Sequence, residues 1–155
     1  PNAMNACPDE IESLNHAIHA ALESGHFRRA RDLCDRWDFL VPANPNPLSE
    51  RARQLADAVE AGTFGEQGVR EVLQILADIQ RSGHARTSNT AIRLRYENPT
   101  ESFLYERVIA VPPAVASEMN ERLADEVTAR TDLMADPGLR FVAVFTGSMT
   151  DGGNA

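Results

Sequence analysis

Two histidines and two carboxylates stand on one predicted helical stripe near the N-terminus. Glu12, His16, His19 and Glu23 are spaced i, i+4, i+7 and i+11, so their side chains line one face and could ligate a divalent metal. This face lies opposite the apolar side of the same helix, where polar residues are expected without any ligand. A bound metal also needs a ligand from a second element, and only His26 is nearby. We therefore interpret the stripe as a solvated face and expect no metal site.

Four arginines fall on the predicted strands and could form a patch that binds an anion. The planar guanidinium of Arg offers two parallel hydrogen bonds to a carboxylate or a phosphate. On a half-exposed sheet, arginines also pair with carboxylates of a neighbouring strand, such as Glu106, and then need no ligand. Paired surface arginines are the favoured interpretation, and the anion patch is the alternative. The patch would consist of Arg93, Arg95, Arg107 and Arg140.

No other residues stand in a pattern that requires catalysis. Thr146-Gly147-Ser148 follows an apolar strand, as phosphate-cradling turns do, but only seven residues come after it, too few for the helix that such turns open. Cys34 lies on an apolar helical stripe, where a buried thiol is the common case. The sequence contains neither G-x-S-x-G nor H-E-x-x-H. We expect no catalytic, cofactor-binding or metal-binding residues, and lean towards a protein that is not an enzyme.

The composition narrows the functional classes further. The 155 residues carry 15 basic and 23 acidic side chains, a net charge of −8, and every basic residue is Arg. The absence of lysine excludes a phosphate-loop lysine and a Schiff-base lysine. An acidic chain repels polyanions, so binding to nucleic acids or anionic membranes is disfavoured. Two cysteines without a CxxC pattern, and no apolar run of about 20 residues, favour a soluble cytoplasmic protein.

The N-terminal half predicts four helices between residues 9 and 82. Pro1–Ala3 precede Met4 and are interpreted as an expression-vector remnant, with Met4 as the natural start. Trp37 shares an apolar stripe with the buried positions of the second helix and is expected to anchor the core. The helices should begin at the capping pairs Asp9/Glu12, Asn46-Pro47 and Thr63/Glu66 and end near Gly25, Pro42, Gly62 and Gly83.

The two helix pairs are similar to each other in sequence. The string LESGHF at residues 22–27 recurs as VEAGTF at residues 59–64, a displacement of 37 residues. Such a period is typical of solenoid repeats, although a plain four-helix arrangement is favoured. Residues 25–30 (GHFRRA), followed by Pro42, resemble the second half of a tetratricopeptide repeat, within a helix pair that covers residues 9–42. The resemblance implies a helical hairpin of the kind that this family uses to grip extended peptides.

The C-terminal half predicts a β-hairpin followed by a β-α-β unit. After a polar linker at residues 86–90, apolar and polar residues alternate along two segments joined by an Asn-Pro-Thr-Glu turn. The second segment then leads into a long amphipathic helix, whose stripe includes Val115, Met119, Leu123, Val127 and Met134, and into the strand at residues 141–145. The favoured hairpin register pairs Tyr96 with Phe103, Leu94 with Tyr105, Arg93 with Glu106 and Glu97 with Ser102.

These elements predict an α+β fold within one compact domain. A four-helix region spans residues 4–85, a three-stranded sheet with one long crossover helix spans residues 86–147, and residues 148–155 form a flexible tail. The strand FVAVF at residues 141–145 should lie at an edge of the sheet, where either the N-terminal helices cover it or a second chain joins it. Of these two arrangements we favour a symmetric homodimer.

Two classes of function remain open from the sequence. The favoured one is a non-enzymatic protein-interaction or assembly module with a protein partner, because helix pairs recur and catalytic groups are lacking. The alternative is a small ligand-binding regulator or an enzyme that acts on an anionic metabolite through the arginine-bearing sheet.

Overall fold

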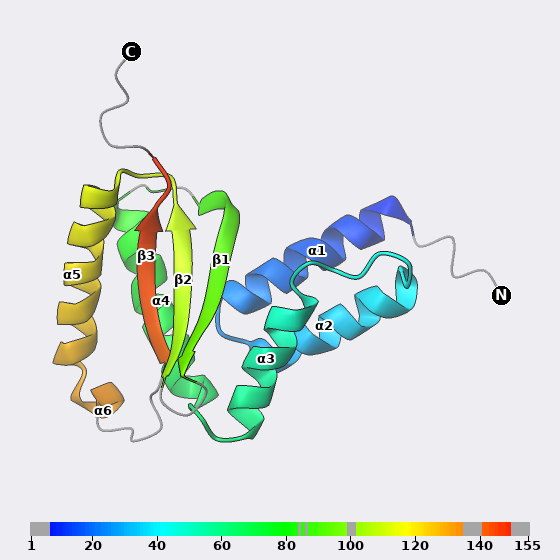
Figure 1. Cartoon of the computed structure of the whole chain (residues 1–155), viewed down its shortest axis with the longest axis horizontal. Helices are drawn as coiled ribbons and strands as arrows, with labels where there is room; N and C mark the ends of the chain where they lie inside the picture. The colour runs from blue at the N-terminus through cyan, green and yellow to red at the C-terminus, as the bar shows by residue number, and fades with distance from the viewer. Residues whose placement is uncertain (1–6, 84, 86, 99–101, 135–140, 150–155) are drawn as a thin grey trace, which may run out of the picture. The chain divides into compact units, whose positions relative to one another are not determined.

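The computed structural model describes residues 7–83, 85, 87–98, 102–134 and 141–149, and for 87–98, 102, 103 and 134 it describes the backbone alone. The chain is an α+β protein, as the sequence predicts. It divides into two compact units, one ending at Arg70 and the other beginning at Glu71 (Figure 1). This division falls inside the helix that spans Glu66–Ser82, whereas the sequence places the boundary between the helical region and the sheet region at residue 85.

The first unit is helical. It contains α1 (Pro8–Glu23), α2 (Phe27–Leu40), α3 (Ser49–Glu60) and the first turn of α4 (Glu66–Ser82). Large apolar side chains from each of these parts are fully buried, and the rings of Phe27 and Phe64 meet edge to face with their centroids 6.2 Å apart. This T-shaped pair joins the start of α2 to the segment that leads into α4.

The two corners with similar sequences have the same backbone geometry. Gly25 and Gly62 both adopt a left-handed conformation, with φ of 81° and 73°. After each glycine, the next N–H turns back to the helix that has just ended: His26 donates to the C=O of Ala21 and Thr63 donates to that of Ala58, both at 2.9 Å. This bond is the mark of a glycine-terminated helix.

The predicted helix starts are wrong in detail. α1 begins at Pro8 and Cys7 occupies the N-cap position without a side-chain bond, so Asp9 and Glu12 do not form a capping box. α4 begins at Glu66, which places this residue at the first helical position instead of the third. α3 begins at Ser49 rather than Pro47, because the side-chain oxygen of Asn46 accepts the N–H of Leu48 at 2.9 Å and holds a turn ahead of the helix.

Trp37 is not part of the fully buried core, contrary to the sequence-based expectation. It lies in the last turn of α2, is only half-buried, and donates its indole N–H to the C=O of Asn44 at 2.9 Å. Its ring therefore fastens the connector between α2 and α3.

The second unit contains the rest of α4 and the sheet. The strands are β1 (Thr87–Asn98), β2 (Ser102–Ile109) and β3 (Phe141–Gly147), and α5 (Pro113–Ala129) and the short α6 (Thr131–Met134) connect β2 to β3. Their order is β1-β2-β3, with β1 antiparallel and β3 parallel to the central β2 (Figure 1). β3 is therefore an edge strand, and α5 packs against it.

The register of the hairpin confirms three of the four predicted pairs. The Cα partners include Tyr96 with Phe103, Leu94 with Tyr105 and Arg93 with Glu106. Ser102 stands opposite Asn98 rather than Glu97, because the register shifts after Tyr96.

The two faces of β3 differ in burial. Phe141 and Phe145 are buried on the same face as Tyr105 of β2, whose ring lies 5.5 Å from that of Phe141. Val142 points to the opposite face and is 48% exposed. The sequence predicts cover on both faces for such an uninterrupted apolar run, and the exposure of Val142 shows that this expectation is wrong for one face.

The two glycine corners differ in the space around them, which allows a matched test. A Cβ at Gly62 meets nothing within 4 Å, whereas at Gly25 it lies 3.0 Å from Cγ of Arg70 and 3.3 Å from the backbone of that residue. Gly62→Ala should cost about 1 kcal/mol of unfolding free energy from left-handed strain alone. Gly25→Ala should cost roughly 1 kcal/mol more, because α4 must also shift. Urea titration of both variants measures this difference, and equal losses would contradict the close approach of α4 to Gly25.

Candidate functional site

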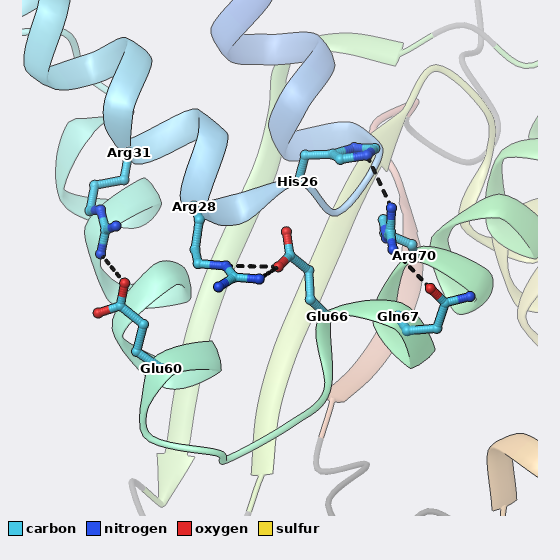
Figure 2. A network of polar contacts seen from close by, with 7 residues as sticks. All are labelled: His26, Arg28, Arg31, Glu60, Glu66, Gln67 and Arg70. Atoms are coloured by element: carbon cyan, nitrogen blue, oxygen red, sulfur yellow. Dashed lines mark hydrogen bonds and ion pairs between the residues drawn. The ribbon is translucent and has the colours of Figure 1, made fainter.

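A set of polar contacts joins α2 to the end of α3 and the start of α4 (Figure 2). Arg28 donates twice to one carboxylate oxygen of Glu66, over 2.9 Å from Nε and 2.7 Å from Nη2. Arg31 donates to Glu60 over 2.7 Å. The guanidinium groups of Arg28 and Arg31 each face a carboxylate from a different helix, so these two pairs fasten helices to one another.

His26 lies at the other side of the same network (Figure 2). Its Nε2 is 3.4 Å from Nη1 of Arg70, and its Nδ1 is 2.9 Å from Oγ of Ser24. Because a guanidinium only donates, Nε2 accepts and the ring proton is on Nδ1, which donates to Ser24. The hydroxyl of Ser24 donates in turn to the C=O of Ala20 at 2.7 Å. This serine is therefore not activated by the histidine, and the contact is structural rather than nucleophilic.

The four residues considered as metal ligands are spread along α1. Glu12 and His16 are exposed, and His19 and Glu23 are partly exposed. Among the described residues, no group of three or more His, Cys, Asp or Glu side chains is arranged to hold a metal ion.

Of the four arginines proposed for an anion patch, Arg107 is the one whose side chain is described. It is buried, with 3% of its surface exposed. Its Nη1 donates to Oε1 of Gln80 and its Nη2 to the hydroxyl of Tyr105, each over 3.2 Å, and the guanidinium lies 5.7 Å from the centre of the Tyr105 ring. Arg107 thus stabilises the interior of the second unit and does not lie on an open surface. The side chains of Arg93, Arg95 and Arg140 lie outside the described residues.

The Thr146-Gly147-Ser148 segment continues the sheet. The N–H of Ser148 donates to the C=O of Ile109 at 2.9 Å, and that of Met149 donates to the C=O of Val111 at 3.2 Å. A Cβ at Gly147 would lie 2.6 Å from the carbonyl oxygen of Val111, so the glycine is needed for the close approach of two backbones. Amides that are already bonded in this way do not cradle a phosphate.

The sequence analysis missed the role of Asn120 on α5. Its side-chain NH₂ donates to the C=O of Phe145 at 2.9 Å, and its side-chain oxygen accepts the N–H of Phe145 at 2.7 Å. These are the two bonds that a neighbouring strand would make, so Asn120 replaces such a strand at this point of the sheet edge. A single Asn beside an apolar stripe carries no sequence signal for this role.

The bonds of Phe145 show which backbone groups of β3 face the free edge. Both polar groups of one strand residue point the same way, and successive residues alternate. Since the backbone N–H and C=O of Phe145 point away from β2, those of Ala143, two residues earlier, point away from β2 as well. Among the described residues, no partner is found for the N–H and C=O of Ala143.

A groove runs beside this open position. It has a volume of about 340 Å³ and is predominantly apolar. Its walls are formed by Val72 of α4, residues 141–144 of β3, and Asn120, Leu123, Ala124 and Val127 of α5. An unpaired strand edge next to an apolar groove is an arrangement that can accept an extended polypeptide segment.

The described residues thus define an α+β protein with a helical unit and a sheet that is open at one edge. No protein-family model matches the chain, and neither a curated protein nor a solved structure matches it. No helix in the described part of the chain is long and apolar enough to cross a membrane.

The two cysteines should differ strongly in reactivity. Cys7 is exposed, whereas Cys34 is buried and its burial raises the pKa of the thiol. At pH 8, a thiol reagent such as Ellman's reagent should modify Cys7 first and Cys34 slower by roughly tenfold or more, until urea unfolds the chain. Cys7→Ser is the control that isolates Cys34. Rapid reaction of Cys34 in the folded variant would restore it as a candidate nucleophile.

Proposed function

We propose that this protein is a non-enzymatic interaction or assembly module that binds a protein partner through the free edge of β3. The observation that carries the proposal is the open backbone of Ala143 beside the apolar groove between α5 and β3. β3 contains no charged residue and no proline, the features that usually prevent an edge strand from pairing with another chain. A partner strand would hydrogen-bond to the open backbone of Ala143 and would cover the apolar surface of the groove.

The helical unit supports the same class of function. The corners at Gly25 and Gly62 share their geometry, and the phenylalanines that follow them are both buried and in contact. We propose, on this basis and on the resemblance of residues 9–42, that α1 and α2 form a tetratricopeptide-like pair. The net charge of −8 and the free thiols of Cys7 and Cys34 support a protein partner, rather than a nucleic acid, in the cytoplasm.

A homodimer through the same edge is the second candidate, because an uncharged edge strand can also pair with a copy of itself. Light scattering at micromolar concentration separates the two assemblies. A homodimer has twice the 17.0 kDa mass of the chain. It should return to the chain mass when Val144→Lys places a charge on β3.

The alternative function, binding of an anionic metabolite through strand arginines, has a separate test. Anionic metabolites should then raise the melting temperature of the wild-type protein, and Arg95→Ala should abolish the effect. Such a result would contradict a purely non-enzymatic interaction module.

Ala143→Pro tests the proposed binding edge directly. Proline removes the N–H at Ala143 without breaking the β2–β3 ladder, because this N–H faces the free edge. Capture of a stoichiometric partner from the native host should fall about tenfold, since the added strand loses one or two hydrogen bonds.

Ala143→Ser keeps the N–H and a small side chain, and should bind as the wild-type protein does. Circular dichroism checks that both variants are folded. If folded Ala143→Pro captures the partner as well as Ala143→Ser does, the binding surface lies elsewhere and the proposal fails.

A further inference from the structure

The occupant of the groove can be inferred from its size, its ends and its charge, and this inference depends on the proposed function of the β3 edge. Phe141–Val144 form one wall, and an extended segment rises about 3.3 Å per residue, so roughly four partner residues fit alongside them. The groove volume of about 340 Å³ has room for one or two apolar side chains. The site is therefore suited to a short extended segment.

Asn120 limits the direction in which such a segment can extend. Its amide already occupies the N–H and C=O of Phe145, at 2.7 and 2.9 Å. An added strand can pair at Ala143 but must end before Phe145 unless Asn120 moves. The wall of the groove and the open backbone thus coincide at Ala143.

One carboxylate of α5, that of Glu121, lies next to the groove. Ala124 lines the groove, Glu121 lies one turn before it on the helix, and Asp125 lies one turn after Glu121. Glu121 and Asp125 are exposed, and no ion pair or hydrogen bond of their side chains is found among the described residues. The same holds for Glu118, whereas Glu126 is paired with Arg122 over 3.0 Å. Glu121 is thus available to a cationic group of a partner in the groove, whereas Asp125 and Glu118 lie roughly 100° or more around the helix from Ala124 and add only to its negative charge.

A second copy of the chain fits this site poorly. In a symmetric pairing of two β3 strands centred on Ala143, each Phe141 would meet a Phe145 whose backbone Asn120 already occupies. The two α5 helices would also come together, and each carries four carboxylates and one guanidinium. Both effects oppose self-association and favour an occupant of opposite charge.

We propose that the groove between α5 and β3 binds an extended, basic segment of a partner protein. The segment adds to the sheet at Ala143, places one or two apolar side chains in the groove, and directs a flanking Lys or Arg side chain to Glu121. Main-chain bonds and the apolar pocket hold the segment, and the charges select it.

Three synthetic peptides of about eight residues, with blocked ends, test this proposal. One alternates Lys with Val, the second alternates Lys with Ser, and the third alternates Glu with Val. Titration into the isotopically labelled full-length protein should shift the backbone amide of Ala143 and the side-chain amide of Asn120 with the Lys–Val peptide. The Lys–Ser peptide should bind about tenfold or more weakly, because it lacks the apolar side chains. The Glu–Val peptide should also bind about tenfold or more weakly, because the acidic helix α5 repels its negative charges.

Two variants extend the test to the protein. Ala143→Pro should weaken binding of the Lys–Val peptide about tenfold, and Glu121→Gln should weaken it severalfold and reduce its salt dependence. Both substitutions lie at the surface or the free edge. If one of them perturbs folding, Ala124→Glu provides a second way to block the groove.

Equal binding of all three peptides, or shifts that avoid Ala143 and Asn120, would overturn the proposal. A homodimer that Ala143→Pro dissociates, or a natural partner that binds Ala143 through an acidic segment, would overturn it while leaving the proposed function of the edge intact. If neither the peptides nor a natural partner require Ala143 for binding, both the basic-segment proposal and the proposed function of the β3 edge are wrong.

Discussion

The hydrogen-bonding demand of the backbone is the constraint on which the rest of this structure depends. Each N–H and C=O that leaves a helix or a sheet ladder must find another partner or face water. At the helix corners, Gly25 and Gly62 allow the chain to bond back onto the preceding helix. At Phe145, the side chain of Asn120 supplies both bonds. At Ala143 the described residues supply neither, and this difference between two positions of one strand concentrates the binding potential of the sheet at a single place.

The features that could be predicted from the sequence are those with local causes. Apolar periodicity and glycine signals locate the helices of the first unit and their corners. The hairpin register could be predicted because three cross-strand pairs, Tyr96 with Phe103, Leu94 with Tyr105 and Arg93 with Glu106, favour the same alignment. The helix starts were less predictable, because an asparagine such as Asn46 can either cap a helix or hold a turn before it. Here Asn46 holds the turn, and its buried side chain also donates a hydrogen bond to the side chain of Asn15.

The features that could not be predicted depend on distant contacts. Arginine alternating with other residues on a strand indicates a half-exposed sheet, yet β2 is central and both Glu106 and its neighbour Arg107 are buried. The candidate site also depends on contacts between residues that are distant in the sequence. Asn120 and Phe145 are 25 residues apart, and only the crossover of α5 onto β3 brings the amide to the strand edge. Sequence periodicity assigns Asn120 to the border of an apolar stripe and goes no further.

Charge and hydrogen bonding together oppose the pairing of this apolar edge strand with a second copy of itself. An uncharged strand such as β3 is normally a hazard, because any extended chain can add to it. Here Asn120 shortens the available edge, and α5, which carries four carboxylates and one guanidinium, lies beside what is left. Identical copies bring the same amide and the same negative charge, so they repel one another at this place. A basic segment meets neither obstacle, so in the proposed complex the same features that oppose self-association also select the partner.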